Sequence, residues 1–180
     1  MQPQRRRLIT RLPALGALAL GLRPVVSAAQ NTPVALEATA PALPAEGTVV
    51  RLPELTLLDG SVFHPEQARG HTTLIYWWAS TCPFCALQSP EMQKFWLAQQ
   101  SRGLQMLALS VDKTPTAALT YLQKKGYTFP AAWVTPAVQQ VLPKPRGLPI
   151  TLVLGRQGQV LQAEKGQLFP EDVAQLARWL

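Results

Sequence analysis

Apolar and polar positions along the chain follow two periodicities, one typical of buried strands and the other of amphipathic helices. Apolar runs with little polar alternation predict strands over residues 72–78, 104–111, 132–135 and 151–154. Apolar residues at helical spacing, together with capping residues, predict helices over residues 86–101, 115–125, 137–142 and 170–180.

Turn signals add two hairpins to this pattern. Asp59-Gly60 stands between the apolar segments 54–58 and 61–64, which is a strong short-range signal for a hairpin. Residues 155–158 turn the last strand into the alternating segment 159–164. Because strands alternate with helices and a hairpin comes last among the strands, we expect an α/β fold with a mixed central sheet flanked by helices.

Positive charge is concentrated at the N-terminus. The 180 residues include 17 basic and 10 acidic side chains, a net charge of +7, but residues 1–29 hold five of the arginines and no acid. Without this segment, 12 basic groups stand against 10 acidic ones, a net charge of +2. The remaining sequence contains no block of basic residues typical of a nucleic-acid site, so no nucleic-acid partner is expected.

Residues 1–29 have the composition of a secretory signal peptide. Arginines at positions 5–7 precede an apolar stretch over residues 12–22, and small residues follow, which fits cleavage after Ala28 or Ala29. The apolar stretch has 11 residues, fewer than the roughly 18–20 that span a bilayer, so no permanent membrane anchor is expected. An ordinary Sec signal is favoured, with a twin-arginine signal as the alternative. The mature chain is therefore expected in the periplasm.

The remaining chain divides into a linker and one domain. Residues 30–48 are rich in Ala, Pro and Thr and show no periodicity, which predicts a flexible linker. The folded domain is expected over residues 49–180, a length typical of a single domain.

The chain holds two cysteines, Cys82 and Cys85, spaced C-x-x-C between a predicted buried strand and a predicted helix. The N–H groups and the dipole at a helix N-terminus stabilise a thiolate, which is the nucleophile of disulfide exchange. Pro83 suits the first helical turn, where its missing N–H would be unpaired anyway. Helical geometry leaves Cys82 at the exposed tip and Cys85 one turn in. Cys82 should therefore attack, and Cys85 should resolve the mixed disulfide.

Other roles for the cysteine pair are less favoured. A structural disulfide that closes so short a loop would stabilise the chain little. A structural zinc site usually needs four nitrogen or sulfur ligands, and both histidines, His64 and His71, lie on the far side of the strand over residues 72–78. A fortuitous spacing on an inert fold is the third alternative. We therefore expect a redox-active disulfide, with no metal and no further cofactor.

A proline precedes one of the predicted strands. Leu148-Pro149 stands directly before the strand that starts at Ile150, with Gly147 beside it. This is a good site for a cis peptide bond, with an ordinary trans turn as the alternative. The preceding strand–CxxC–helix unit strengthens the cis interpretation.

Together these features resemble the thioredoxin superfamily, and within it the exported TlpA/ResA-like thiol–disulfide oxidoreductases. Trp78, four residues before Cys82, falls on the family's usual tryptophan, and GLPITLVL resembles its cis-proline strand. The interval of 67 residues from Cys82 to Pro149 has room for an added β–α unit at residues 110–133. The resemblance covers about residues 52–180 and implies a thioredoxin-like fold with an N-terminal β-hairpin and this inserted unit.

The resemblance also implies roles for individual residues. Cys82 would be the nucleophile and Cys85 the resolving thiol, while the backbone of Gly147, Leu148 and Pro149 would hold a partner chain in extended form. Residues that would support the cysteine pair are Trp78, Thr81, Pro83, Phe84, Gln88 and Pro149. The implied partners are protein thiols and disulfides, together with a membrane electron donor of DsbD type.

Three positions depart from the family pattern. Tyr76 occupies the place of a buried acid in plain thioredoxins, Gln88 stands where ResA-like proteins often carry Glu, and Thr81 replaces a common Trp. Because both carboxylates are missing, Cys85 is expected to lose its proton through water or a more distant group such as Glu91, or else reduction is slower at neutral pH. The simpler interpretations are that Tyr76 is a packed core aromatic and Gln88 a solvated helix residue.

Three functions remain open on these residues. The leading hypothesis is a periplasmic thiol–disulfide oxidoreductase that acts through Cys82-Pro83-Phe84-Cys85 as a reductase. A dithiol oxidase is the enzymatic alternative, because Pro83-Phe84 is close to the Pro-His dipeptide of DsbA. A non-catalytic copper-binding or copper-delivery module is the third, since thiolates can hold Cu(I), with Met92 and Met106 as nearby sulfur ligands.

Overall fold

The computed structural model describes residues 40–180, which fold around a five-stranded sheet in the order β5-β4-β3-β6-β7. The strands of this sheet are β3 Thr73–Trp78, β4 Gln105–Ser110, β5 Ala131–Trp133, β6 Ile150–Leu154 and β7 Val160–Lys165. The first three run parallel, whereas β6 and β7 pair antiparallel with their neighbours. This mixed sheet confirms the predicted fold class.

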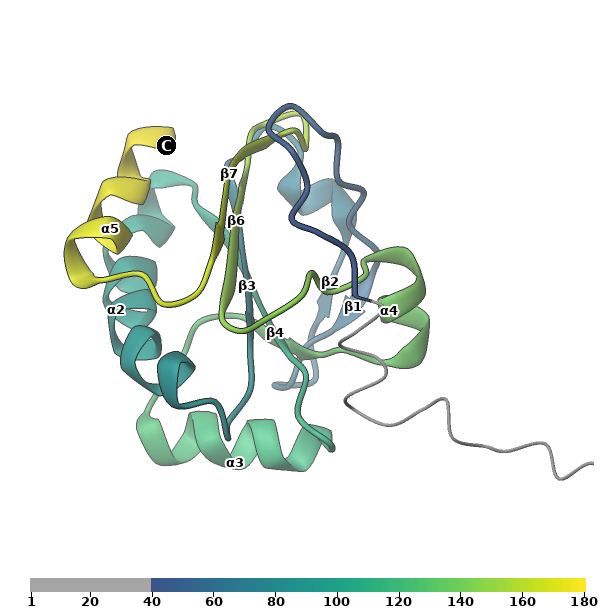
Figure 1. The fold of residues 1–180 in the computed structure, drawn as a ribbon, viewed down its shortest axis with the longest axis vertical. Helices are drawn as coiled ribbons and strands as arrows, with labels where there is room; N and C mark the ends of the chain where they lie inside the picture. Colours follow the sequence, from purple (N-terminus) through teal and green to yellow (C-terminus); the bar gives the residue numbers. More distant parts are fainter. Residues whose placement is uncertain (1–39) are drawn as a thin grey trace, which may run out of the picture.

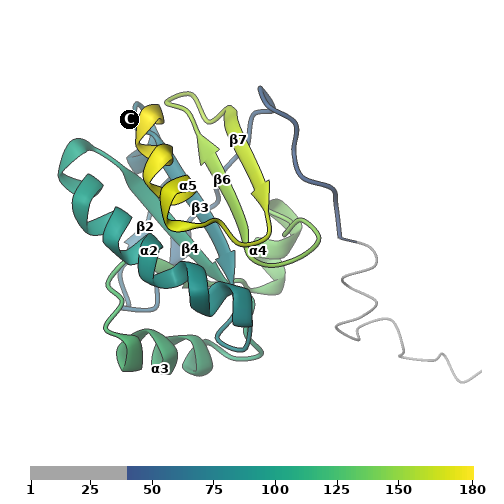
Figure 2. The same ribbon diagram turned by 60° about the vertical axis from the view of Figure 1, so that its left-hand side comes forward.

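Helices cover both faces of the sheet (Figure 1). They are α2 Pro83–Gln99, α3 Pro115–Lys125, α4 Pro136–Val141 and α5 Pro170–Gln175, with 3₁₀ segments η2 Pro65–Ala68, η3 Gln100–Arg102 and η4 Leu176–Trp179. Figure 2 shows α2 and α5 side by side in front of the sheet. The opposite face carries α4 and the predicted N-terminal hairpin, formed by β1 Leu55–Thr56 and β2 Val62–Phe63.

The central strand β3 supplies side chains to two cores, because successive residues of a strand point to opposite faces. Leu74, Tyr76 and Trp78 pack in the first core, on the side of α2, α3 and α5. Ile75 and Trp77 pack in the second core, with the β1–β2 hairpin and α4. None of the five is more than 1% exposed, which confirms a strand buried on both faces.

Two helices differ from their predicted bounds by more than one residue or are divided, whereas α4 is shifted by a single residue. The first begins at Pro83, three residues early, because Cys82 takes the N-cap position and Pro83 the first helical position. The C-terminal helix is divided, since α5 ends at Gln175 and η4 continues as a 3₁₀ turn. The region predicted to hold an inserted unit contains α3 and β5. Thr114 caps α3, its side chain accepting from the Ala117 N–H.

Residues 40–48, the N-terminal strap, belong to the predicted linker but are hydrogen-bonded to the sheet. The Gly47 N–H donates to the Val160 carbonyl at 2.8 Å, and the Val160 N–H donates to the Thr48 carbonyl at 2.9 Å. These bonds pin the end of the strap to β7. The ordered domain therefore begins before residue 49, the boundary that composition predicts.

The strap starts beside α4, at the loop that precedes β6 (Figure 1). The Arg146 N–H donates to the Pro41 carbonyl at 3.0 Å, and Leu43 packs against the second core. The predicted signal peptide and residues 30–39 of the predicted linker lie outside the described residues. Between residues 40 and 180, no helix combines the length and the apolar character needed to cross a membrane.

Candidate active site

The loop after β3 carries Cys82 to the N-terminus of α2. Cys82 is the N-cap residue, and the backbone N–H of Cys85, in the first turn, donates to Cys82 Sγ at 3.2 Å. The two residues form a disulfide bond, with their Cα atoms 5.2 Å apart. Cys82 is partly exposed whereas Cys85 is 1% exposed, which is the difference that helical geometry predicts. An incoming thiolate therefore has access to the sulfur of Cys82.

Strand β6 brings Pro149 to the same end of the sheet. The Leu148–Pro149 peptide bond is cis, and Ile150, which follows it, pairs with Trp77 of β3. This register places Pro149 next to the C-terminal end of β3, where the loop to Cys82 begins. The disulfide and the predicted partner-binding residues are thus brought together.

The side chain of Tyr76 lies beneath the first turn of α2. Its hydroxyl is 3.0 Å from Ser89 Oγ and donates to the Cys85 carbonyl at 3.3 Å, while Ser89 Oγ donates to the same carbonyl at 2.8 Å. Burial raises the pKa of the Tyr76 hydroxyl, which keeps this group protonated and neutral. Tyr76 is confirmed as a packed core aromatic, and its hydroxyl also helps to hold the backbone of Cys85. Ser89 was not singled out from the sequence.

Gln88 is fully buried, so its interpretation as a solvated helix residue is wrong. Its Nε2 donates to Thr151 Oγ1 at 3.0 Å, and its Oε1 accepts from the Leu168 N–H at 2.8 Å. The amide faces the sheet and the segment before α5 because it lies one turn beyond Cys85 on the inner side of α2. An amide can satisfy a donor and an acceptor at once without titrating.

A buried carboxylate that the sequence analysis missed holds the loop before Cys82. Asp112 is 9% exposed and accepts from the N–H and the hydroxyl of Ser80 and from the hydroxyl of Ser110. Its own carbonyl accepts from Trp133 Nε1 at 2.7 Å. One sequence signal could have found it. Asp112 follows β4, and Cys82 follows β3; since these neighbouring strands are parallel, the residues after them lie at the same edge of the sheet.

The Redoxin family matches residues 38–178. The chain belongs to the Redoxin family. It is similar to the thiol-disulfide oxidoreductase ResA of Geobacillus kaustophilus (strain HTA426), with 26% identity over 121 residues that cover 66% of this chain and 68% of that protein. ResA of Geobacillus thermodenitrificans (strain NG80-2) is 27% identical over 124 residues, 67% of this chain and 70% of that protein.

Solved structures share the fold of this redoxin. A thiol:disulfide interchange protein of the thioredoxin family from Chlorobium tepidum TLS has a TM-score of 0.68 and 20% identity, covering 75% of this chain and 97% of that one. StoA from Bacillus subtilis has a TM-score of 0.60 and 18% identity, covering 76% and 98%. With its Cys82–Cys85 pair on this thioredoxin-like fold, the redoxin is a ResA-like thiol–disulfide oxidoreductase.

The other predicted site residues of the redoxin differ in their exposure to solvent. Thr81 and Pro83 are exposed, and so is Phe84, at 56%. Trp78 is buried and its ring stacks obliquely on Tyr121, with centroids 5.4 Å apart. The surface at the cysteines is therefore made by the loop and the first helical turn, and the tryptophan belongs to the core below.

Glu91, the carboxylate considered for proton transfer from Cys85, has a different partner. Its side chain is partly buried on α2 and pairs with Lys94 Nζ at 2.8 Å. The groups that contact the Cys85 backbone are instead the neutral hydroxyls of Tyr76 and Ser89.

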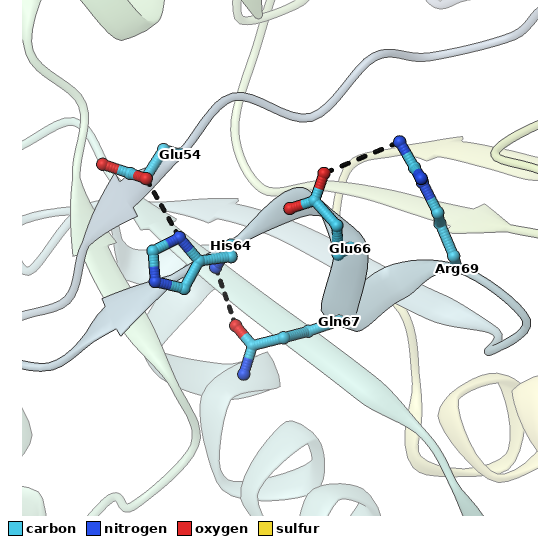
Figure 3. Close-up of polar contacts among 5 residues, drawn as sticks. All are labelled: Glu54, His64, Glu66, Gln67 and Arg69. Atoms are coloured by element: carbon cyan, nitrogen blue, oxygen red, sulfur yellow. Dashed lines mark hydrogen bonds and ion pairs between the residues drawn. The ribbon is translucent and has the colours of Figure 1, made fainter.

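The histidines of the redoxin lie away from the disulfide. His64 Nδ1 is 2.9 Å from Glu54 Oε2 (Figure 3), and His71 Nδ1 is 3.1 Å from the Gly103 carbonyl. Across residues 40–180, no group of three or more His, Cys, Asp or Glu side chains is arranged to hold a metal ion. Met92 and Met106 are buried in the first core, so neither offers a sulfur ligand at the surface beside Cys82.

Proposed function

We propose that this redoxin is exported to the periplasm and reduces disulfides of partner proteins there. The observation that carries the proposal is the asymmetry of the cysteine pair, with an accessible Cys82 at a helix N-terminus and a buried Cys85 within disulfide-bonding distance. An accessible nucleophile with an internal resolving thiol is the arrangement that disulfide exchange requires.

The reaction begins with both cysteines reduced. The Cys82 thiolate attacks one sulfur of a partner disulfide, which forms a mixed disulfide and releases the partner's other sulfur as a thiolate that takes a proton from solvent. Cys85 then loses its proton and attacks Cys82 Sγ. This step closes the Cys82–Cys85 disulfide and releases the second partner thiol. Two electrons pass from the cysteine pair to the partner, and the pair is left oxidised.

The environment of Cys82 favours the thiolate form that starts this sequence. The Cys85 N–H, which donates to Cys82 Sγ at 3.2 Å, would donate a stronger hydrogen bond to a thiolate. The N-terminus of the 17-residue helix α2 adds a positive dipole potential. Both effects lower the free energy of the charged form.

Proton removal from Cys85 requires an external acceptor on this proposal. The Tyr76 hydroxyl stays protonated because burial raises its pKa, and the Gln88 amide does not titrate. Water that enters beside the partly exposed Cys82 is the acceptor that we propose.

We propose that partner chains bind in extended form along Gly147, Leu148 and Pro149. These residues lead into β6 beside the C-terminal end of β3, where the loop to Cys82 begins. An extended chain can pair there through main-chain hydrogen bonds that tolerate many sequences. The ammonium group of Lys144 donates to the Gly147 carbonyl at 2.9 Å, which helps to fix this loop. Re-reduction of the disulfide would come from a membrane electron donor of DsbD type.

Trapping of mixed disulfides tests the exchange reaction. The Cys85→Ser variant should accumulate covalent adducts with partner proteins that dissociate on addition of dithiothreitol, and the matched Cys82→Ser variant should accumulate none. Equal trapping by both variants would reject the assigned roles. An equilibrium potential near about −270 mV would support a reductase, whereas one near about −120 mV would assign an oxidase.

Export has a separate test. When the full chain is expressed in a Gram-negative host, the periplasmic fraction should contain a protein whose first residue is Ala29 or Gln30, as shown by mass spectrometry. Retention of the intact chain in the cytoplasm would reject the periplasmic assignment and leave the exchange chemistry unaffected.

A further inference from the structure

A cleft of about 620 Å³ opens at the end of the sheet opposite the disulfide. Its lining comes from residues 49–52 ahead of β1 and from η2 with Arg69. Residues 154–158, at the end of β6 and in the turn after it, complete it. Thr73, the first residue of β3, also lines it. Since β3 has six residues, the cleft and the start of the loop to Cys82 lie roughly 17 Å apart along the strand.

Each of the three segments contributes one arginine to the lining, namely Arg51, Arg69 and Arg156. Backbone hydrogen bonds hold these segments to one another. The Val50 N–H donates to the Gly158 carbonyl at 2.9 Å, and the Gly70 N–H donates to the Arg156 carbonyl at 3.0 Å. The three guanidinium groups are therefore carried by a frame that is already fixed.

The charge of these arginines is largely uncompensated. None of the described residues that line the cleft is acidic. Arg69 pairs with Glu66 at 3.6 Å (Figure 3), but both side chains are mostly exposed, so this ion pair is weak. Within residues 40–180, neither Arg51 nor Arg156 has an ion-pair partner.

The cleft also has an apolar part. Leu52, Ala68 and Leu154 line it together with the arginines. A cavity that combines apolar walls with a few charged groups is typical of sites for small organic ligands. The charge selects an anion, and the apolar walls provide a surface for a carbon skeleton.

We propose that this cleft binds a phosphate-bearing ligand whose carbon skeleton lies against the apolar wall. A phosphate carries up to two negative charges and several acceptor oxygens, and the planar fork of an arginine donates to two of them at once. Three arginines in the lining of one cleft match that charge better than they match a single carboxylate. The site goes beyond thiol–disulfide exchange, and its occupation leaves Cys82 accessible.

Calorimetric titration of the full chain with inorganic pyrophosphate at low ionic strength tests the proposal. Arg51→Gln and Arg156→Gln should each weaken pyrophosphate binding by about tenfold, because each removes charge-assisted hydrogen bonds. Arg178→Gln is the matched control, since it removes the same charge from a residue outside the cleft lining and should leave binding unchanged. Binding that is equal in all three variants and the parent would overturn the proposal, as would equally tight binding of citrate.

Vesicle sedimentation distinguishes a free phosphate from a lipid headgroup. Phosphatidylglycerol vesicles are compared with phosphatidylcholine vesicles, and the readout is the difference between variants because residues 1–29 also carry arginines. Loss of phosphatidylglycerol binding in Arg51→Gln and Arg156→Gln, but not in Arg178→Gln, assigns the lipid source. Absence of cleft-dependent binding to both vesicles and pyrophosphate overturns the site. Insulin reduction should be equal in all variants, so the outcome of the binding tests is independent of the proposed reductase activity.

Discussion

Asp112 and Ser80 join the two loops that leave the C-terminal ends of β3 and β4. Asp112 Oδ1 accepts from the Ser80 N–H at 3.0 Å and from the Ser80 hydroxyl at 2.6 Å. Ser80 lies two residues before Cys82, and the Cys82 N–H donates to the Ala79 carbonyl at 3.1 Å. The carboxylate thus fixes the turn that presents the accessible sulfur.

Replacing Asp112 with Ala should lower the free energy of unfolding by about 1–3 kcal/mol, because the buried hydroxyl of Ser110 and the partly buried donors of Ser80 lose their acceptor. Reduction of insulin should also slow, since the turn before Cys82 is released. Urea denaturation and the insulin assay measure the two effects. Glu171→Gln, an exposed change of charge on α5, is the control and should stay within about 0.5 kcal/mol of the parent. A stable and fully active Asp112→Ala variant would contradict the assigned role.

Replacing Tyr76 with Phe tests the buried hydroxyl. At neutral pH the change should cost about 0.5–1.5 kcal/mol, since one hydrogen bond to the Cys85 carbonyl is lost while that from Ser89 remains. Above about pH 10, the ordinary pKa of tyrosine, the unfolded chain releases the phenolic proton whereas the buried hydroxyl, with its raised pKa, retains it. Since the unfolded state then binds fewer protons, stability falls as pH rises.

Tyr76→Phe lacks this alkaline loss, so its deficit in unfolding free energy should shrink above pH 10. Chemical denaturation on both sides of that pH measures the difference. Tyr121→Phe, at a partly buried position in α3, is the control at neutral pH, where its cost should be the smaller of the two. A deficit for Tyr76→Phe that is constant with pH would show that the hydroxyl is not held in its protonated form.

Replacing Gln88 with Ala tests the buried amide. The change leaves the Leu168 N–H without its acceptor and Thr151 without its donor, which should cost about 1–3 kcal/mol of unfolding free energy. The same substitution at Gln123, an exposed position of α3, should stay within about 0.5 kcal/mol. Equal stability of the two variants would contradict the stabilising role assigned to the two hydrogen bonds of Gln88.

Local pattern was sufficient to predict most elements and the cysteine geometry. The apolar run over residues 72–78 predicts a strand buried on both faces, which the structure has as Thr73–Trp78, and the C-x-x-C at a helix start predicts which cysteine is the more exposed. Thr114 and Gly126 bound α3 because caps act within one turn of the helix end.

The interactions that the sequence did not reveal join distant residues. Gln88 meets Leu168 across 80 positions, and Asp112 meets Ser80 across 32, so neither burial nor partner follows from a local window. The strap has the composition of a linker, yet its backbone N–H and carbonyl groups find partners on β7 irrespective of side-chain type. Composition measures the tendency of side chains to be buried and misses bonds of this kind.

The strap gives the last prediction. A chain that starts at residue 49 loses the bond between Pro41 and Arg146, the bonds to Val160 and the packing of Leu43, compared with a chain that starts at residue 40. Its unfolding free energy should be lower by about 2 kcal/mol. Because Arg146 adjoins Gly147, the loop proposed to bind partners should become more mobile, and KM for a protein disulfide should rise.

A change in KM without a change in kcat would distinguish a role of the strap in partner binding from a general loss of stability. Cys82 caps α2 and Cys85 lies in its first turn, whereas the strap bonds of Pro41, Gly47 and Thr48 go to Arg146 and Val160. We therefore expect kcat and the reduction potential to be unchanged. Leu43→Ala in the chain that starts at residue 40 is the matched variant: it should lower stability by about 1 kcal/mol while it keeps the backbone bonds, and its KM should stay near that of the parent. An equal rise of KM in both variants would mean that stability alone controls partner binding. An unchanged KM in the shorter chain would mean that the loop before Pro149 holds its shape without the strap.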